Sequence, residues 1–481
     1  MKLHMRFVMA LMLIMPLAAS VCSASEKPNI IFMLSDDQGW NGLSVAMHPE
    51  VAASKGDIFY TPNLEKLAAQ GMRFSSAYAP SPVCSPTRIS LQTGKSPAQL
   101  HWTKAAPAVP GRMLTEPRLI KDLSRDETTV GELLKKAGYT TAHYGKWHIA
   151  GGGPGAHGYD ENDGDTGNEN AFKFTDPNPV DIFGMAERAA KFMEKSKTAN
   201  KPFYIQLSWN ALHAPELAMK ATQAKYEKLT SGNNSKQVAT AAITEDLDSG
   251  VGKVLEAVER LGLSGNTYVI YMSDNGSGGG AKRGGLSGGK GSVWEGGIRV
   301  PLIVRGPGVA PNSWCNVPVV GYDFLPTFCA MGGLAEKELP NGIEGGNISV
   351  LLKNEGKGIV KRAREELVFH FPHYQSDDGP HSAIRLGDLK LIHFYENDRV
   401  SLFDLSKDIG ERNDLAKQMP GEAKMLSDRL EKYLIDVKAQ MPTKNTEFDP
   451  AKPIAPRKGG KGGDKNDKGN GKGAKKGSSK E

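Results

Sequence analysis

The sequence lacks the features of a membrane-embedded or nucleic-acid-binding chain. The apolar run of residues 7–19 is shorter than the about 20 residues that a bilayer-spanning helix requires. The formal net charge is +6, but residues 1–24 carry +2 and residues 457–481 carry +6, which leaves −2 for the rest of the chain. A slightly acidic body excludes a nucleic-acid partner, and we predict no transmembrane segment.

The first residues are typical of a secretory signal. Lys2 and Arg6 precede the short apolar run, and Cys22-Ser23-Ala24 offers a small-residue cleavage site. We therefore expect residues 1–24 to be a signal peptide and the protein to be exported, either to the periplasm or out of the cell.

Cysteine is also scarce, with four in 481 residues. Cys22 would leave with the signal peptide, and Cys84 lies in a distinctive motif described below. An exported protein permits Cys315 and Cys329 to form a disulfide. Two free buried thiols are the alternative.

Residues 446–481 consist mostly of Gly, Lys, Asp, Asn and Ser. Such a composition cannot bury a core, so we expect a disordered basic tail. We favour a solvated tether over adhesion to an anionic polysaccharide or cell surface.

The segment Cys84-Ser85-Pro86-Thr87-Arg88 combines several signals of a helix start. Pro82 keeps the incoming chain extended. Ser85 is a candidate N-cap for a helix whose first turn contains Pro86, and Gly94 is a plausible stop. Cys84 is therefore expected at a helix N-terminus, where unpaired N–H groups and the helix dipole favour an anion.

Four apolar β-type runs stop abruptly at polar residues, and helical patterns separate them. The runs are 29–35 before Asp36-Asp37, 138–144 before Gly145-Lys146-Trp147-His148, 203–208 before Trp209, Asn210 and His213, and 267–273 before Asp274-Asn275; the helical patterns span 63–70, 129–137, 182–195 and 239–261. Near-continuous apolar strands alternating with helices predict an α/β fold with a large, mostly parallel sheet sandwiched by helices. Ligands bind at the carboxyl ends of such strands, so the polar clusters predict one shared pocket.

The pattern changes after about residue 340. Short strands are expected at 366–371, 382–385, 389–394 and 400–404, followed by a helix at 414–437. We therefore predict a catalytic domain at 25–345 and a smaller α+β domain with an antiparallel sheet at 346–445.

Asp36, Asp37, Asp274 and Asn275 offer only hard oxygen ligands. Such a set suits Ca²⁺ or Mg²⁺ and disfavours zinc. Each pair alone would more often be a turn, but two pairs at two strand ends favour a metal site.

Lys146, His148, His213 and Lys290 add cationic and proton-transferring groups, which together with a divalent ion and an arginine would hold a doubly charged oxyanion. The segment 284–291 nearly matches a phosphate-binding P-loop, but Gly291 stands where that motif has Ser or Thr. We reject the nucleotide interpretation and expect a Gly-rich loop that lets Lys290 reach the pocket.

Two stretches resemble the signature blocks of type I sulfatases, which belong to the alkaline-phosphatase-like superfamily. Residues 82–94 contain the modification motif Cys-x-Pro-x-Arg, and residues 138–148 match the second block throughout. The resemblance extends from about residue 27 to 440 and departs at Gln92, where the family usually has an apolar residue.

This resemblance implies that a formylglycine-generating enzyme converts Cys84 to formylglycine (3-oxoalanine), whose hydrate is the nucleophile. One hydroxyl attacks the sulfur of a sulfate ester, and the second hydroxyl later expels sulfate from the covalent sulfo-enzyme. Asp36, Asp37, Asp274 and Asn275, together with modified Cys84, would hold one Ca²⁺ ion, Mg²⁺ being the less favoured alternative.

The family pattern also implies roles for the surrounding residues. Arg88 would steady the formylglycine, while Lys146 and Lys290 would bind sulfate oxygens. His148 would contact the hydrate and act as base, and His213 would protonate the leaving oxygen.

The segments 369–374 and 380–385 resemble bacterial sulfatases that act on sulfated sugars. Trp102, His370, His373 and Arg385 are our candidates for lining the outer pocket. The expected substrate is a sulfated small molecule or glycan, based on galactose or a hexosamine.

Two alternatives stay open at this point. One is a phosphate or phosphonate monoester hydrolase of the same superfamily, which the intact 138–148 block and Lys290 disfavour. The other is an unmodified, inactive protein that binds sulfated glycans, which would follow if Cys84 stays a thiol.

Overall fold

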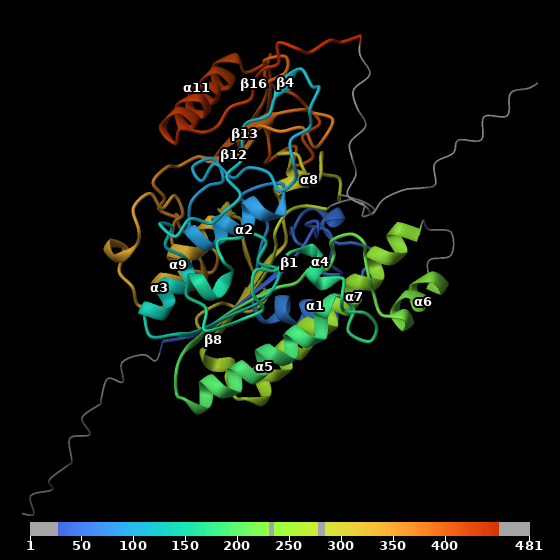
Figure 1. The fold of residues 1–481 in the computed structure, drawn as a ribbon, viewed down its shortest axis with the longest axis vertical. Coiled ribbons are helices and arrows are strands. Elements are labelled where there is room, and N and C mark those ends of the chain that lie inside the picture. Colours follow the sequence, from blue (N-terminus) through green and yellow to red (C-terminus); the bar gives the residue numbers. More distant parts are fainter. Residues whose placement is uncertain (1–26, 230–234, 278–283, 452–481) are drawn as a thin grey trace, which may run out of the picture.

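The computed structural model describes residues 27–229, 235–277 and 284–451. Its centre is an eight-stranded sheet that crosses the middle of the larger part of the molecule (Figure 1). In spatial order the strands are β10 (Ser313–Cys315), β2 (Met72–Phe74), β9 (Leu302–Arg305), β8 (Thr267–Ser273), β1 (Asn29–Ser35), β7 (Phe203–Ser208), β5 (Thr140–Gly145) and β6 (Glu161–Asn162).

The sheet is mostly parallel. β1 pairs in parallel with both β7 and β8, and β5 continues the parallel run beyond β7. β9 runs antiparallel to β8 and β2. All seven residues of β1 are buried, as expected for a strand covered on both faces. The predicted α/β fold is confirmed.

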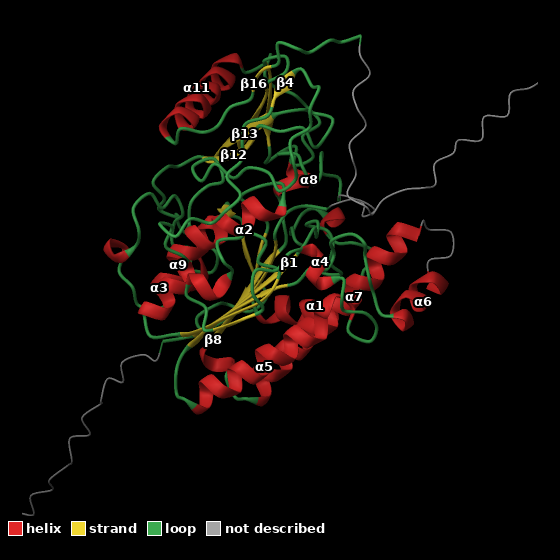
Figure 2. Cartoon of the chain, in the orientation of Figure 1, coloured by secondary structure: helices red, strands yellow, loops and turns green. Residues whose placement is uncertain are grey.

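Helices cover both faces of this sheet, as Figure 2 shows. On one side α1 (Pro62–Gln70), α5 (Ile182–Thr198) and α7 (Ser235–Arg260) pack against Ile31 and Met33. On the other side α2 (Cys84–Thr93), α3 (Val130–Lys136) and α9 (Phe324–Met331) pack around Phe32. Because side chains alternate along a strand, one apolar strand supplies both cores.

The second sheet is antiparallel and belongs to the C-terminal part of the chain. Its order is β12 (Leu367–Phe371), β13 (His381–Leu386), β14 (Leu389–Phe394) and β15 (Arg399–Asp404). The helix α11 (Pro420–Asp436) packs on one face of it through Leu426 and Leu430. It begins six residues later than residue 414, our predicted start, because the Asp414 carboxylate accepts from the backbone N–H groups of Leu402 in β15 and of Ala416, and Pro420 supplies the first helical residue.

The described chain ends by returning to the larger part. β16 (Thr443–Lys444) pairs antiparallel with β4 (Leu114–Thr115), and β3 (Ala77–Tyr78) pairs with β11 (Val319–Val320). The other short helices are η1 (Ala52–Ser54), η2 (Pro154–His157), α4 (Asn168–Ala171), η3 (Pro179–Asp181), α6 (Lys220–Leu229), η4 (Ser264–Asn266), α8 (Glu295–Ile298), η5 (Gly321–Asp323), η6 (Glu336–Glu338) and α10 (Ser349–Lys353).

Some predictions fall outside the described residues. The signal peptide at 1–24 and the tail beyond residue 451 are among them, and the domain boundary at 345/346 stays a prediction.

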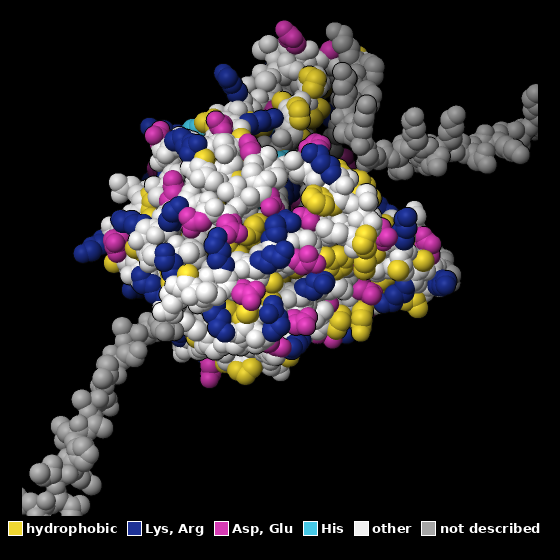
Figure 3. Space-filling view, turned by 60° about the horizontal axis from the view of Figure 1, so that its bottom comes forward, with side chains coloured by type: hydrophobic (Ala, Val, Ile, Leu, Met, Phe, Trp, Pro, Cys, Tyr) yellow, Lys and Arg dark blue, Asp and Glu magenta, His cyan; other side chains and the backbone are white. Residues whose placement is uncertain are grey.

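Among the described helices, none has both the length and the apolar character needed to cross a membrane. Cys315 and Cys329 are buried free thiols. The face drawn in Figure 3 intersperses basic and acidic side chains.

Candidate active site

Cys84 occupies the first position of α2, with Val83 as the extended N-cap residue. The predicted cap at Ser85 is wrong: the helix begins at Cys84, two residues earlier than expected, so Ser85 lies inside the first turn. Gly94 ends the helix with φ 68°, as predicted. Cys84 is 3% exposed, so the motif is a buried helix N-terminus.

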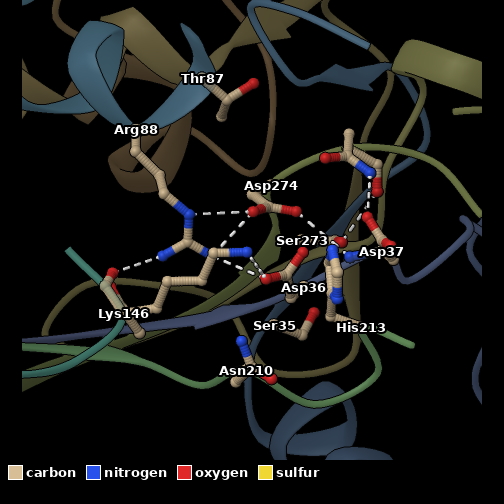
Figure 4. Close-up of polar contacts among 12 residues, drawn as sticks. Ser35, Asp36, Asp37, Thr87, Arg88, Lys146, Asn210, His213, Ser273 and Asp274 are labelled. Atoms are coloured by element: carbon tan, nitrogen blue, oxygen red, sulfur yellow. Dashed lines mark hydrogen bonds and ion pairs between the residues drawn. The ribbon is translucent and has the colours of Figure 1, made fainter. Parts of the chain in front are cut away.

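Arg88 lies one turn after Cys84 and joins the motif to two strand ends (Figure 4). Its Nε and Nη2 lie 3.1 and 2.7 Å from Asp274 Oδ2, and its Nη1 donates to the Lys146 carbonyl at 2.6 Å. The guanidinium is buried, where its planar donors hold neighbouring groups in fixed positions. Thus α2, β8 and the end of β5 meet at one side chain.

Asp36, Asp37 and Asp274 form an acidic cluster at the carboxyl ends of β1 and β8. One oxygen from each carboxylate lies within 4.8 Å of the others. The backbone maintains this arrangement, since Asp274 N donates to Ser35 O at 3.0 Å and Asp37 N donates to Asp274 Oδ1 at 3.2 Å. The predicted convergence of two strand ends is therefore present.

Two oxygens at these strand ends lack a hydrogen-bond partner among the described residues. Asp36 Oδ1 and Asn275 Oδ1 are buried, and no described residue bonds either of them. An unsatisfied buried acceptor is costly, so both oxygens are suited to a ligand. A site made only of carboxylate and amide oxygens fits a hard divalent cation such as Ca²⁺ or Mg²⁺.

The acidic cluster also needs positive charge for electrostatic reasons. Burial opposes ionisation of Asp36, but the charges of Lys146 and Arg88 outweigh it and hold the pKa of this carboxyl well below its ordinary value. Burial and the neighbouring Asp36 raise the pKa of Asp274 to about 8, against the attraction of Arg88. A bound cation would relieve this repulsion.

Lys146 and Lys290 each pair with a different carboxylate of the cluster. Lys146 Nζ contacts Asp36 Oδ2, and Lys290 Nζ lies 2.6 Å from Asp37 Oδ1. Gly145 makes the sharp exit from β5 possible, since its φ is +88° and a Cβ there would lie 2.3 Å from Ser208 O. Gly291 N donates to Pro82 O at 2.9 Å, which ties the Gly-rich loop to the cysteine motif.

His148 and His213 are both disposed to be neutral. Burial and the charges of Lys146 and Arg88 lower the pKa of His148 to about 3, and its buried Nδ1 has no partner among the described residues. Burial also lowers the pKa of His213, despite the opposing charge of Asp36. His213 Nδ1 lies 2.8 Å from the Ala214 carbonyl and donates to it, leaving Nε2 as the acceptor.

Sequence reasoning missed Asn168, which links this histidine to Asn210. Asn210 Nδ2 donates to Asn168 Oδ1 at 3.1 Å, and Asn168 Nδ2 lies 3.5 Å from His213 Nε2. Asn168 belongs to the four-residue helix α4. A helix this short has no apolar periodicity, so no sequence pattern marked it.

The four candidate substrate residues are buried and bonded to other protein groups, and their role in an outer pocket stays a prediction. Trp102 is 4% exposed and donates to the Lys104 carbonyl at 3.1 Å. His370 bonds Ser382 Oγ at 2.7 Å and the Gln440 carbonyl at 2.9 Å.

The side chains of the other two candidates are also hydrogen-bonded within the protein. His373 is fully buried between Glu116, at 2.8 Å, and Thr103, at 2.7 Å. Arg385 is bonded to the Tyr78 hydroxyl and to the Gly387 carbonyl. All four side chains hold the C-terminal sheet, or the loop at 101–116, in place.

Comparisons with known proteins agree with this geometry. The family model described as "Sulfatase" matches residues 28–334. The chain belongs to the sulfatase family. A second model, described as "N-sulphoglucosamine sulphohydrolase, C-terminal", matches residues 289–440. This sulfatase is therefore a sulfuric ester hydrolase, as the resemblance of its two signature blocks implied.

Individual relatives cover most of the chain. The sulfatase is 28% identical to arylsulfatase A of Homo sapiens, over 89% of this chain and 91% of the relative. It is 32% identical to N-acetylgalactosamine-6-sulfatase of Rattus norvegicus, over 59% and 58%. Among solved structures, Ps i-CgsB in complex with k-i-k-neocarrahexaose is 25% identical, with a TM-score of 0.71 over 85% of this chain and 93% of that one.

Proposed function

We propose that this sulfatase is exported and cleaves sulfate esters of carbohydrates, using formylglycine made from Cys84 and one bound Ca²⁺ ion. The observation that carries the proposal is Arg88, which begins one turn after Cys84 and bonds both Asp274 and the backbone of Lys146. Through this side chain the candidate nucleophile, the metal ligands and an anion-binding lysine form one buried unit.

Formylglycine supplies a hydrated aldehyde whose two hydroxyls allow both attack on sulfur and later release of sulfate. The partner-free oxygens of Asp36 and Asn275, together with Asp37 and Asp274, are the residues that would hold the cation. The cation would supply positive charge where the ester oxygens and the nucleophile meet.

Lys146 and Lys290 would bind the non-bridging sulfate oxygens. Both ammonium groups now contact carboxylates of the acidic cluster, so a cation bound there would free them to turn toward the substrate. As the S–O bond breaks, fixed positive charge stabilises the negative charge that develops on oxygen.

The two histidines divide the proton transfers. His148 is held neutral by burial and by the charges of Lys146 and Arg88, which suits a base for a hydroxyl of the modified residue. His213 carries its proton on Nδ1 and would use Nε2 toward the leaving oxygen, taking up a proton there before donating it. We assign it the role of acid.

A carbohydrate ester is the substrate class that the relatives favour. One relative is an N-acetylgalactosamine-6-sulfatase, and a neighbour in fold binds k-i-k-neocarrahexaose. We therefore propose sulfated galactose or N-acetylhexosamine units as substrates. The signal-like pattern of residues 1–24 supports export.

The decisive experiment is peptide mass analysis of protein from its native host. In the tryptic peptide of residues 74–88, Cys84 should have lost its sulfur and gained an aldehyde oxygen. The thiols of Cys315 and Cys329 serve as internal controls and should be unchanged. An intact Cys84 thiol in active protein would refute the proposed nucleophile.

Activity measurements complete the test. Sulfate release from sulfated sugars should disappear in Cys84→Ala and persist in Cys329→Ala. A matched aryl sulfate and aryl phosphate should be compared on the same protein. Faster phosphate cleavage would instead support the phosphate-ester alternative.

A further inference from the structure

A cavity of about 340 Å³ lies beside the active site. Lys146 and Asn210 form the wall shared with that site, and Asp163, Lys173, Phe174, Asp181 and Arg188 line the rest, together with smaller residues. Its volume falls within the about 300–1,000 Å³ of typical small-ligand sites. Figure 4 shows Asn210 beside Ser35 and Asp36, and the same Asn210 lines the cavity.

Apart from Lys146, the charges of this wall cancel. Arg188 Nη2 lies 2.9 Å from Asp163 Oδ2 and 2.6 Å from Asp181 Oδ2, and Lys173 is a second cation. A balanced wall does not select an anion, in contrast to the lysines and arginine around Cys84. The cavity is therefore suited to the uncharged part of the substrate rather than to its sulfate group.

Two buried polar atoms of the wall make no hydrogen bond to a described residue. Asn210 is 2% exposed, and its Oδ1 has no hydrogen bond within the described chain, although its Nδ2 is engaged. Arg188 Nε is also a buried donor without an acceptor there. A ligand that both donates and accepts hydrogen bonds, as a hydroxyl group does, would satisfy both atoms.

Phe174 adds an apolar surface to this polar wall. The side chain is 41% exposed. A ligand in the cavity could therefore cover an aromatic surface that water now contacts. A pyranose has hydroxyls around its edge and C–H groups on its faces. Its polar and apolar surfaces correspond to those of this cavity.

We infer that this cavity is the subsite for the alcohol portion of the ester and takes a neutral, hydroxyl-bearing pyranose ring. The inference rests on the proposed function. Asn210 accepts from a ring hydroxyl, Arg188 donates to a ring oxygen, and Phe174 packs on the ring face. Asn168 bonds both Asn210 and His213. One amide side chain therefore connects the sugar subsite to His213, the group assigned to protonate the leaving oxygen.

The test compares Phe174→Ala with wild-type protein whose Cys84 modification has been verified. Monosulfated galactose and N-acetylhexosamine sugars are the substrates, and cleavage of 4-nitrophenyl sulfate by wild type verifies that the protein is active. We expect KM for the cleaved sugar to rise about tenfold, equivalent to about 1.4 kcal/mol, with kcat for that sugar within about twofold. Phe174→Tyr should keep the wild-type KM, and Ile435→Ala, an exposed apolar residue on α11, should change neither KM nor kcat.

A binding measurement removes the dependence on turnover. In a Cys84→Ala background, calorimetry should show the same sugar binding about tenfold more weakly when Phe174 is also Ala. A fall in kcat with KM unchanged, or no change in sugar binding, overturns the subsite. Wild-type protein that cleaves the aryl sulfate but no sugar also overturns it, whereas failure to cleave any sulfate ester refutes the proposed function instead.

Discussion

The acidic cluster at the strand ends and a second buried network, between the two sheets, contain similar groups in different arrangements. In the second network Glu295 lies 2.6 Å from Arg299 and 2.8 Å from Lys390, while Glu411 lies 2.8 Å from the same lysine. The remaining Glu411 oxygen accepts from Glu295 N at 2.7 Å. Each carboxylate oxygen of this network therefore has a nitrogen within 2.8 Å; Glu411 Oε1 makes no hydrogen bond to a described residue, but it is paired with the Lys390 ammonium group.

The acidic cluster is not closed in this way. Asp36 Oδ1 and Asn275 Oδ1 lack partners within the described residues, and three carboxylates converge on one point. Buried charge alone does not separate a ligand site from a structural ion network. The distinguishing feature is a set of buried acceptors that have neither a hydrogen bond nor a paired cation among the described residues.

The largest effect on activity should come from removing one carboxylate charge of the acidic cluster. Asp274→Asn removes a candidate metal ligand, and we expect activity to fall by on the order of a hundredfold or more, since even partners of metal ligands contribute about 10–100-fold. Thermal unfolding with Ca²⁺ or a chelator checks this. Wild type should gain Tm with Ca²⁺, and the variant should not.

The control for this prediction is stability without metal. In chelator the Asn variant should unfold at the same temperature as wild type or higher, because one of three crowded carboxylates is gone. A large loss of Tm in chelator would mean that Asp274 serves the fold rather than a cation.

Breaking the second network, called the closed network below, should lower stability and leave turnover intact, the reverse of the Asp274 variant. Lys390→Met leaves Glu295 and Glu411 buried without their shared cation, and we expect a loss of about 3–5 kcal/mol in the free energy of unfolding. Turnover at a temperature well below Tm should persist. Lys407→Met, in an exposed pair with Asp404, is the matched control and should leave stability unchanged.

An uncharged network beneath α2 should show an intermediate effect. Gln92 Nε2 donates to Gln206 Oε1 at 2.8 Å, and the Tyr159 hydroxyl donates to Gln92 Oε1 at 2.8 Å. Gln92→Leu should cost about 1–3 kcal/mol, because buried polar partners are left unsatisfied. In chemical denaturation the double variant with Tyr159→Phe should lose less than the sum of the single variants; strict additivity would rule out the coupling.

The smallest effect is a pH dependence of the closed network. Burial, together with Glu295, raises the pKa of Glu411 to about 7 from 4.5, against the attraction of Lys390. Between these values the native state holds a proton that the unfolded chain has released, so this group's contribution to stability is lost as pH rises toward 7. Glu411→Gln cannot titrate.

Unfolding free energies of wild type and Glu411→Gln should therefore be compared from pH 5 to pH 8. The difference should move in favour of the variant as pH rises. Parallel curves would show that Glu411 keeps the same proton occupancy in both states.

Much of the architecture could be predicted because strands and charge clusters leave local signals. β1, β7 and β8 begin and end where the apolar runs do. Asp36 and Asp274 were expected together because parallel strand ends converge at one edge of a sheet.

The sequence is least informative where tertiary contacts decide. His370 and His373 are bonded to the Gln440 carbonyl and to Glu116, which are 70 and 257 residues away in the sequence. Gln92, which departs from the family pattern, is explained by Gln206, 114 residues further on. Its partner could not be recognised from neighbouring residues alone.

The enclosure of α2 sets an order of events during biosynthesis. All ten residues of this helix are buried, and its cover depends on a sheet whose central strand pairs with partners 174 and 238 residues away. Until those partners have been synthesised, the segment around Cys84 stays open to other proteins. On the proposed function, maturation of the nucleophile must therefore happen on a nascent or translocating chain, and once folding is complete an unmodified molecule has no route back to activity except through unfolding.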